Sequence, residues 1–430
     1  MKDVLRELYA GCMPALDPGR ATLAHVRVED RTLVVDDRRV DLDPAARVLV
    51  VAIGKAAVPM ARAALDLLPR RVDAVVVAPP GRDLDGPGVR VFHAAHPTPD
   101  AVSMAAAHAV LEVLDGCTRQ DLVLFLLSGG GSALCEAPLD PGLTLDDMQA
   151  FHHGLVTSSL GIVETNTLRK HASAVKGGRL AVRAAPAQQV TLFVSDVPVA
   201  HPDAVASGPT MPDPTTRADC AALLANEDLR RRLPEPYVRA LTASNLPETP
   251  KAKHPAFAAG SWHCLLDSRS VVEAVRARCV PLGWLVEVDT EHDEAPVADA
   301  AAAAVRRLRA LKAAHPDRTV ALVSSGELSC PVTGDGLGGR NQHFALHCAL
   351  LIEGTSYHVL SAGTDGIDGN SPAAGAIADG TTAARARARG LDPRACLARC
   401  DAFTLFAALG DTLMTGPTGT NVRDLRVLVA

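Results

Sequence analysis

The sequence predicts an α/β fold in two domains, and three observations support this prediction. The chain has 430 residues, which is more than one hydrophobic core usually supports. Hydrophobic residues make up 48% of the chain but aromatic residues only 3%, so Ala, Val and Leu must dominate the interior, as they do in α/β layers. Short β-branched runs alternate with stretches of helical periodicity, which is the pattern of right-handed βαβ units.

In the first half of the chain, the expected strands end at glycine-rich or polar loops. Residues 47–51 (RVLVV) form the first strand, and a helical pattern follows it. Further strands are expected at 72–77, 89–95, 121–127 and 190–194. Because parallel strands bring their carboxyl ends to one edge of the sheet, ligands should collect there. We therefore expect a Rossmann-like, mostly parallel sheet with flanking helices.

A polar stretch separates the two halves. Residues 219–255 are polar and helical in pattern, and five prolines fall between 230 and 255, so we interpret this stretch as an interdomain connection. The expected domains are 1–245 and 255–430. In the second, a further α/β region, strands are expected at 262–266, 285–289, 319–323 and 357–362.

Composition and charge exclude several classes of protein. The net charge of −6 and pI near 6.2 provide no basic field for nucleic acid or an anionic membrane. The N-terminus has no apolar signal core, and no apolar stretch approaches about twenty residues, so we expect a soluble cytoplasmic protein. The ten cysteines form no CxxC pair or regular framework and are expected to be reduced thiols.

Gly54 and Lys55 follow the first expected strand and precede a helix. Free backbone N–H groups at a helix start, together with the lysine charge, suit a phosphate or carboxylate. The spacing of a Walker A loop is absent, and an ordinary turn with a solvated lysine is the alternative.

The second motif is a glycine loop, Ser128-Gly129-Gly130-Gly131-Ser132. Successive glycines let several backbone N–H groups point into one concavity, where a phosphate fits. A flexible linker is the alternative. It is disfavoured because an apolar strand and an Ala/Leu segment enclose the loop.

Two further features of the first half carry charge. Arg169, Lys170 and Lys176 lie in one short basic stretch that could bind an anionic substrate, although a solvated basic helix face is an equal alternative. Asp196, at the end of the strand 190–194, could bind Mg²⁺ or accept a proton from an attacking hydroxyl. Capping of the next segment is the competing role.

The second half holds another set of polar residues in glycine-rich loops. Arg340 beside flexible glycines could neutralise charge on a transferred phosphoryl group. Asp365 and Asp368 bracket a tight turn and could share a magnesium ion, although Asp-Gly turns are common without any ligand. Glu327, Asn341 and Asn421 lie in similar loops. We expect them, with Asp365, to contribute to nucleotide binding.

In this order, the motifs resemble the glycerate 2-kinase family with a MOFRL-type C-terminal domain, some members of which carry an older hydroxypyruvate reductase label. The match covers nearly the whole chain. Its most specific parts are GKAA at 54–57, HPTPD at 96–100, SGGGSAL at 128–134, RKHAS at 169–173, SDVP at 195–198, GGRNQ at 338–342, GTDGIDG at 363–369 and TGPTGTN at 415–421.

The resemblance implies that ATP phosphorylates the 2-hydroxyl of D-glycerate, with Mg²⁺ and a cleft between two α/β domains. Lys55 and Arg340 fall on the family's active-site Lys and Arg, and the glycine loop with Gly54 resembles its phosphate-binding element. The implied partners are ATP and a small hydroxy acid, and a homodimer is left open.

One departure from the family keeps other functions open. After SDVP the family usually has Gly-Asp-Asp, whereas this chain has Val199-Ala200-His201. A kinase with another acceptor, or a family member with altered chemistry, is therefore an alternative. A hydroxypyruvate reductase is a further one, but it needs a dinucleotide site, and no GxGxxG with a downstream acidic residue is apparent.

Overall fold

The computed structural model describes residues 1–42, 46–68, 72–158 and 160–430. It divides into two compact units: Pro18–Leu265, called the sheet-B unit below, and Met1–Asp17 with Leu266–Ala430, called the C-terminal unit. The expected ranges were 1–245 and 255–430, so the structure groups the first seventeen residues with the C-terminal part of the chain. Over the described ranges, no helix combines the length and the apolar character needed to cross a membrane.

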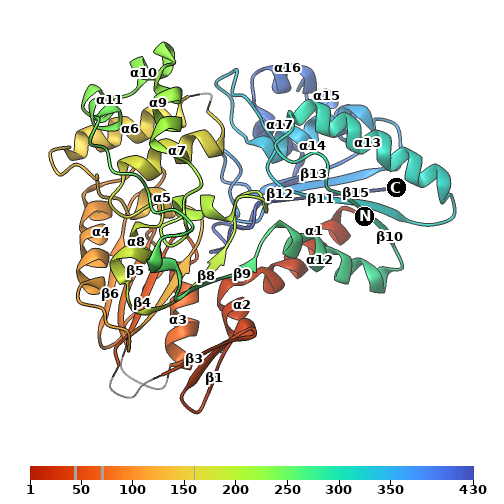
Figure 1. Cartoon of the computed structure of the whole chain (residues 1–430). Coiled ribbons are helices and arrows are strands. Elements are labelled where there is room, and N and C mark those ends of the chain that lie inside the picture. The colour runs from red at the N-terminus through yellow and green to blue at the C-terminus, as the bar shows by residue number, and fades with distance from the viewer. Residues whose placement is uncertain (43–45, 69–71, 159) are drawn as a thin grey trace. The chain divides into compact units, whose positions relative to one another are not determined.

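The sheet-B unit is built on a six-stranded sheet, called sheet B here, in the order β6-β5-β4-β7-β8-β9 (Figure 1). The strands from β6 to β8 are parallel to one another. Their bounds are β4 Val48–Ile53, β5 Asp73–Ala78, β6 Val89–His93, β7 Leu122–Leu127, β8 Gln188–Val194 and β9 Gly260–Leu266. The expected mostly parallel sheet is confirmed, and each of its first five strands lies within two residues of the expected bounds.

Helices and a small hairpin sheet complete this unit. The hairpin strands β1 Val26–Glu29, β2 Thr32–Val35 and β3 Arg38–Asp41 are antiparallel. The helices are α2 Pro18–His25, α3 Ala57–Leu67, α4 Ala101–Leu114, α5 Gly131–Leu134, α6 Leu145–Val156, α7 Ile162–Ala172, α8 Arg179–Ala184, α9 Arg217–Leu224, α10 Glu227–Arg232 and α11 Glu235–Thr242, with 3₁₀ helices η2 Pro202–Ser207 and η3 Pro255–Phe257. Buried side chains of β4, β5 and β7 pack against α4 in the main core.

The polar stretch 219–255 does not act as a linker. It forms α10, α11 and most of α9, whose apolar side chains pack with those of α6 and α7 around the stacked rings of Phe151 and Tyr237. β9 follows it and joins the sheet beside β8, although residues 262–266 were expected to open the second region. Strand periodicity gives no information about which sheet a strand joins, because the pairing partner lies far away in the sequence.

The C-terminal unit contains a mixed six-stranded sheet in the order β10-β11-β15-β12-β13-β14. β10 and β11 are parallel, and the other neighbours are antiparallel. The strands are β10 Leu285–Asp289, β11 Val320–Ser325, β12 His358–Gly363, β13 Gly375–Asp379, β14 Thr412–Leu413 and β15 Asp424–Val429. The helices are α1 Lys2–Cys12, α12 Ser268–Cys279, α13 Val297–Ala314, α14 Arg340–Leu351, α15 Thr382–Ala388, α16 Pro393–Ala398 and α17 Ala402–Leu409, with η1 Met13–Leu16 and η4 Val280–Leu282.

Candidate active site

Three motifs of the sheet-B unit meet where the strand order reverses. From β4 the chain proceeds through β5 and β6 on one side, then returns to β7 and β8 on the other. The switch point therefore lies between β4 and β7, where open parallel sheets bind their ligands. Gly54-Lys55 follows β4, the glycine loop follows β7, and Ser195-Asp196 follows β8. All three lie at the carboxyl edge of the sheet.

The loops after β4 and β7 are in direct contact. The backbone N–H of Lys55 donates to the carbonyl of Gly129 at 2.9 Å, and the N–H of Ala56 donates to Oγ of Ser128 at 2.9 Å. Gly54 has a φ of +126°, and a Cβ atom there would overlap with the oxygens of Ser128. Only glycine fits this position, so the two loops form one continuous backbone surface.

Side chains border the glycine loop on two sides. Gly129 packs against the carboxylate of Asp196, because a Cβ atom on Gly129 would overlap with Oδ2 of Asp196. A Cβ atom on Gly130 would lie 3.3 Å from both Cγ of Lys55 and Cδ2 of His96. The loop therefore lies between a carboxylate and a lysine. His96, in the loop after β6, was not predicted as a site residue.

A chain of hydroxyl and amide groups supports the far end of the loop. The hydroxyls of Ser132 and Ser207 lie 2.7 Å apart, and Ser207 Oγ donates to Oδ1 of Asn166 at 2.7 Å. Ser207 and Asn166 are buried. The sequence analysis missed both as supporting residues, although Asn166 lies just before the basic stretch that begins at Arg169.

Two of the three residues of the basic stretch, Lys170 and Lys176, form ion pairs with carboxylates inside the unit. Lys176 is buried and pairs with Glu136. Although burial alone would raise the pKa of Glu136, Lys176 and a hydrogen bond from His152 hold that pKa below its usual value. Burial lowers the pKa of His152 to about 4, so this ring is neutral at pH 7.

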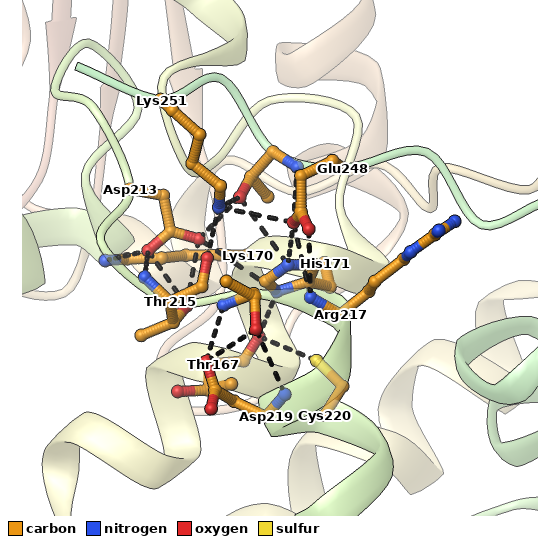
Figure 2. Close-up of polar contacts among 12 residues, drawn as sticks. Thr167, Lys170, His171, Asp213, Thr215, Arg217, Asp219, Cys220, Glu248 and Lys251 are labelled. Carbon is orange, nitrogen blue, oxygen red and sulfur yellow. Dashed lines mark hydrogen bonds and ion pairs between the residues drawn. The ribbon is translucent and has the colours of Figure 1, made fainter. Parts of the chain in front are cut away.

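Lys170 is also buried, and its ammonium donates to Asp203 at 2.6 Å. It also donates to Asp213 at 3.2 Å (Figure 2). Arg169 is the third residue, and burial lowers its pKa. Its Nε has no hydrogen-bond partner among the described residues. A substrate-binding role for the three residues stays a prediction, and the ion pairs of Lys170 and Lys176 favour a structural role for both lysines.

In the C-terminal unit, two carboxylates hold Arg340. Its Nε and Nη2 donate to the two oxygens of Asp424 at 2.6 and 3.1 Å, and Nη2 also lies 2.8 Å from Glu327. Burial opposes the guanidinium charge, but Asp424 and Glu327 outweigh burial and raise the pKa of Arg340. Asp424 is a buried residue at the start of β15 that the sequence analysis missed.

Asp368, one of the expected metal ligands, caps the helix that Arg340 begins. Its oxygens accept hydrogen bonds from the backbone N–H groups of Asn341 and Gln342 at 3.0 and 2.8 Å, and from the side-chain amide of Gln342 at 2.9 Å. Burial raises the pKa of Asp368 to about 6. Both oxygens are therefore engaged inside the unit, which favours a structural role over metal binding.

The other residues expected to bind a nucleotide make hydrogen bonds to neighbouring groups of the same unit. The amide oxygen of Asn341 accepts from Ser361 at 2.7 Å, and that of Asn421 accepts from the N–H of Arg423 at 3.2 Å. Oδ1 of Asp365 accepts from the N–H of Ile367 at 3.2 Å. Their roles toward a nucleotide stay predictions.

Comparison with known proteins identifies the family. Two family models match the chain, "Domain of unknown function (DUF4147)" over residues 4–242 and "MOFRL family" over residues 320–424. A D-glycerate 2-kinase of Thermotoga maritima is 38% identical over 88% of this chain and 89% of its own length. The chain belongs to the glycerate 2-kinase family. The resemblance drawn from its motifs is confirmed.

Other relatives of this glycerate 2-kinase family member agree with that assignment. A crystal structure of glycerate kinase from Thermotoga maritima has a TM-score of 0.83 and 35% sequence identity, and covers 100% of this chain and 99% of that one. A glycerate 2-kinase of Pyrococcus horikoshii is 33% identical over 100% of this chain and 97% of its own length. A protein of Agrobacterium vitis that is provisionally named hydroxypyruvate reductase is 36% identical over 100% of this chain and 94% of its own length. The α/β fold class predicted from the sequence is confirmed.

The departure from the glycerate 2-kinase pattern lies beside the site. His201 is exposed and precedes η2, the 3₁₀ helix that ends at Ser207. It lines a pocket of about 590 Å³ with Asn166, Lys170 and Asp203. The replaced position therefore faces a hollow next to the residues that support the glycine loop.

Proposed function

We propose that this protein is an ATP-dependent kinase that phosphorylates the 2-hydroxyl of D-glycerate or of a related small 2-hydroxy acid. The observation that carries the proposal is the convergence of Lys55, the glycine loop and Asp196 at the switch point of a parallel sheet. The Thermotoga maritima and Pyrococcus horikoshii relatives are named glycerate 2-kinases, and they supply the reaction class.

Each element has a defined part in phosphoryl transfer. This reaction depends mostly on positioning and on neutralising charge, because the protein contributes little covalent chemistry. The backbone N–H groups of the glycine loop can donate hydrogen bonds to a phosphate, and the Lys55 ammonium adds a full positive charge beside them. The contact of Lys55 N–H with the Gly129 carbonyl fixes the lysine's backbone against the loop.

Asp196 suits a magnesium ion that arrives with the nucleotide. Mg²⁺ in such sites is bound by one or two carboxylates together with phosphate oxygens and water. Asp196 supplies one carboxylate against Gly129 of the glycine loop, whereas the oxygens of Asp368 already cap α14. When bound, the ion would neutralise charge on the phosphate oxygens. Asp196 is then also a candidate to accept the proton of the acceptor hydroxyl.

We assign to Arg340 the neutralisation of charge on the transferring phosphoryl group. Its Nε and Nη2 are fixed by Asp424 and Glu327, so the guanidinium plane has one orientation in its own unit. Fixed donors stabilise developing charge without reorganisation during the reaction.

A reductase is less well supported. The β4 loop, Gly54-Lys55-Ala56-Ala57, lacks the glycine spacing that lets a backbone approach a dinucleotide pyrophosphate. The reductase name of the Agrobacterium vitis relatives is provisional.

The decisive measurement is ADP release by the purified full chain with ATP, Mg²⁺ and a panel of 2-hydroxy acids. We expect release that depends on D-glycerate or on a close analogue of it. The absence of release with every acid, together with substrate-dependent oxidation of NADH, would reverse the assignment in favour of a reductase. Restoring aspartate at Ala200 and His201 tests the loop departure. A change in acceptor preference would show that these positions face the acceptor.

A further inference from the structure

A second pocket of the sheet-B unit shares Asp203 and Pro214 with the pocket beside His201 but is lined by none of the glycine-loop residues. Its volume is about 680 Å³, within the range of small-molecule sites. Phe193 of β8 and Trp262 of β9 line it, together with Met211 and Cys264. The walls therefore offer aromatic faces and polarisable sulfur, which suit a flat ring.

One carboxylate in this pocket is available to a ligand. Oδ2 of Asp203 accepts from Lys170 at 2.6 Å, whereas Oδ1 accepts no hydrogen bond within the described parts of the chain. The Asp203 side chain is 23% exposed. Its free oxygen can therefore accept one hydrogen bond from a ligand.

The other charged groups of the pocket are already engaged (Figure 2). Asp213 accepts from Lys170, Thr215 and Thr249 and is fully buried. The Lys251 ammonium donates to Thr215 and Thr249 and lies 3.2 Å from Glu248. Asp203 is thus the polar group that would select a ligand, and the apolar walls would supply most of the contact.

The pocket lies beside the glycine loop along the same sheet. β8 and β9 are the next two strands after β7, and neighbouring strands are about 4.8 Å apart, so β9 lies about 10 Å from β7. Asp196 follows β8 directly and contacts Gly129 of the loop. Asp203 is the second residue of η2, and Ser207 is its last. The Ser207 hydroxyl lies within hydrogen-bond distance of Ser132 in the glycine loop. An elongated ligand could reach from the pocket to the loop.

We propose that this pocket binds the adenine ring of the phosphoryl donor, with Asp203 Oδ1 accepting a hydrogen bond from the 6-amino group. The proposal rests on the proposed kinase function. Adenine presents this single donor beside ring nitrogens. Guanine presents two adjacent N–H donors that match both oxygens of a carboxylate, and Oδ2 of Asp203 is already committed to Lys170.

Fluorescence provides a test that does not depend on turnover. The chain has two tryptophans, and Trp262 lines the pocket. In a Trp284→Phe variant of the full chain, we expect adenosine to quench Trp262 in a saturable way. Purine riboside, which lacks both the 6-amino group and an N1–H donor, should bind more weakly, and inorganic triphosphate should have little effect. If adenosine fails to quench while ATP-dependent turnover is intact, the pocket assignment is overturned and the proposed function stands. Quenching by adenosine without ADP formation from any hydroxy acid supports the pocket and overturns the kinase.

Two substitutions sharpen the test. Ala252 is exposed and lines the pocket, so Ala252→Phe should block it, abolish quenching and raise the KM for ATP at least about tenfold with kcat little changed. Ala258→Phe is the control at an exposed alanine outside the lining. If Ala252→Phe abolishes quenching but leaves the KM for ATP unchanged, adenosine binds as a separate effector and the donor assignment is wrong.

Asp203→Asn should reverse the preference between bases. Its amide oxygen would face Lys170, so its NH₂ would face the pocket and pair with the 6-oxo group of inosine instead of the amino group of adenosine. We expect adenosine binding to weaken at least about tenfold and inosine binding to strengthen. An unchanged preference in a variant that keeps its thermal stability would remove Asp203 from base recognition.

Discussion

Gly129 lies so close to Asp196 that a Cβ atom on the glycine would overlap with Oδ2 of the carboxylate. Gly129→Ala must therefore move either the glycine loop or Asp196. A misplacement of about 1 Å can cost about a hundredfold in rate, so we expect turnover to fall by at least that factor. Gly161→Ala is the matched control, because Gly161 has a φ of −70° and a Cβ atom there would lie 3.8 Å from its nearest neighbour, Oε2 of Glu164. Turnover near the wild-type value in Gly129→Ala would show that this packing is irrelevant to catalysis.

Lys55→Ala removes the positive charge beside the glycine loop. The backbone hydrogen bond from residue 55 to Gly129 does not need the side chain, so the loop should keep its shape. We expect turnover to fall at least about a hundredfold, equivalent to about 3 kcal/mol of transition-state stabilisation. Single-turnover kinetics with thermal melting as a folding control check this. A well-folded variant with normal turnover would exclude Lys55 from the mechanism.

Arg340 and Asp424 should act as one unit. Arg340→Ala is expected to lower turnover at least about a hundredfold. Asp424→Asn should also lower turnover, because the Arg340 guanidinium loses a charged acceptor and is then held less firmly in one orientation. The informative measurement is the double variant. If Asp424 acts by positioning Arg340, Asp424→Asn should cost little further turnover once Arg340 is alanine. Additive losses would instead indicate that Asp424 acts independently of Arg340.

The sequence predicted where the Gly54-Lys55 turn and the glycine loop lie in the fold better than it predicted the residues that support the candidate site. Gly54, Lys55 and the glycine loop follow buried strands directly, so local periodicity and glycine content were sufficient to place them at one sheet edge. Asp424 could not be found in this way, because β15 at the end of the chain was not predicted and its partner Arg340 lies 84 residues away.

The basic stretch also shows that local patterns do not reveal partners that lie far away in the sequence. Lys170 and Lys176 were considered as substrate ligands because they lie with Arg169 in one short basic stretch, and a solvated basic helix face was the equal alternative. Their partners Asp203, Asp213 and Glu136 lie 33, 43 and 40 residues away. A charge run reveals its role only when the fold brings in the opposite charges, and local patterns do not contain that information.

The Lys176–Glu136 pair should be important for stability. Lys176→Met leaves Glu136 as an unpaired charge in a buried site, where Ser173 and His152 remain as hydrogen-bond donors. We expect this single change to lower the free energy of unfolding by about 3–5 kcal/mol. The double variant with Glu136→Gln should lose less free energy of unfolding than Lys176→Met alone, because it has no unpaired charge at this buried site. Urea unfolding of the set measures the difference. A double variant less stable than either single variant would contradict this account.

Glu248 should make stability depend on pH in the acid range. Burial alone would raise its pKa, but His171 and Lys251 hold the pKa at about 2, below its ordinary value of 4.5 (Figure 2). Since the folded state binds this proton less tightly than the unfolded state, the contribution is complete above about pH 4.5 and is lost as the pH falls through 2.

The difference between wild type and Glu248→Gln isolates this effect. The urea midpoint of the wild type should exceed that of the variant at pH 6, and the gap should narrow between pH 4.5 and pH 2. Because the Glu248 side chain is 39% exposed, solvent screens its ion pair, and the gap at pH 6 should also narrow in high salt. Glu235→Gln, at an exposed carboxylate of the same unit, is the control and should show no such narrowing. A gap that stays constant from pH 6 to pH 2 would mean that the charge of Glu248 does not stabilise the fold.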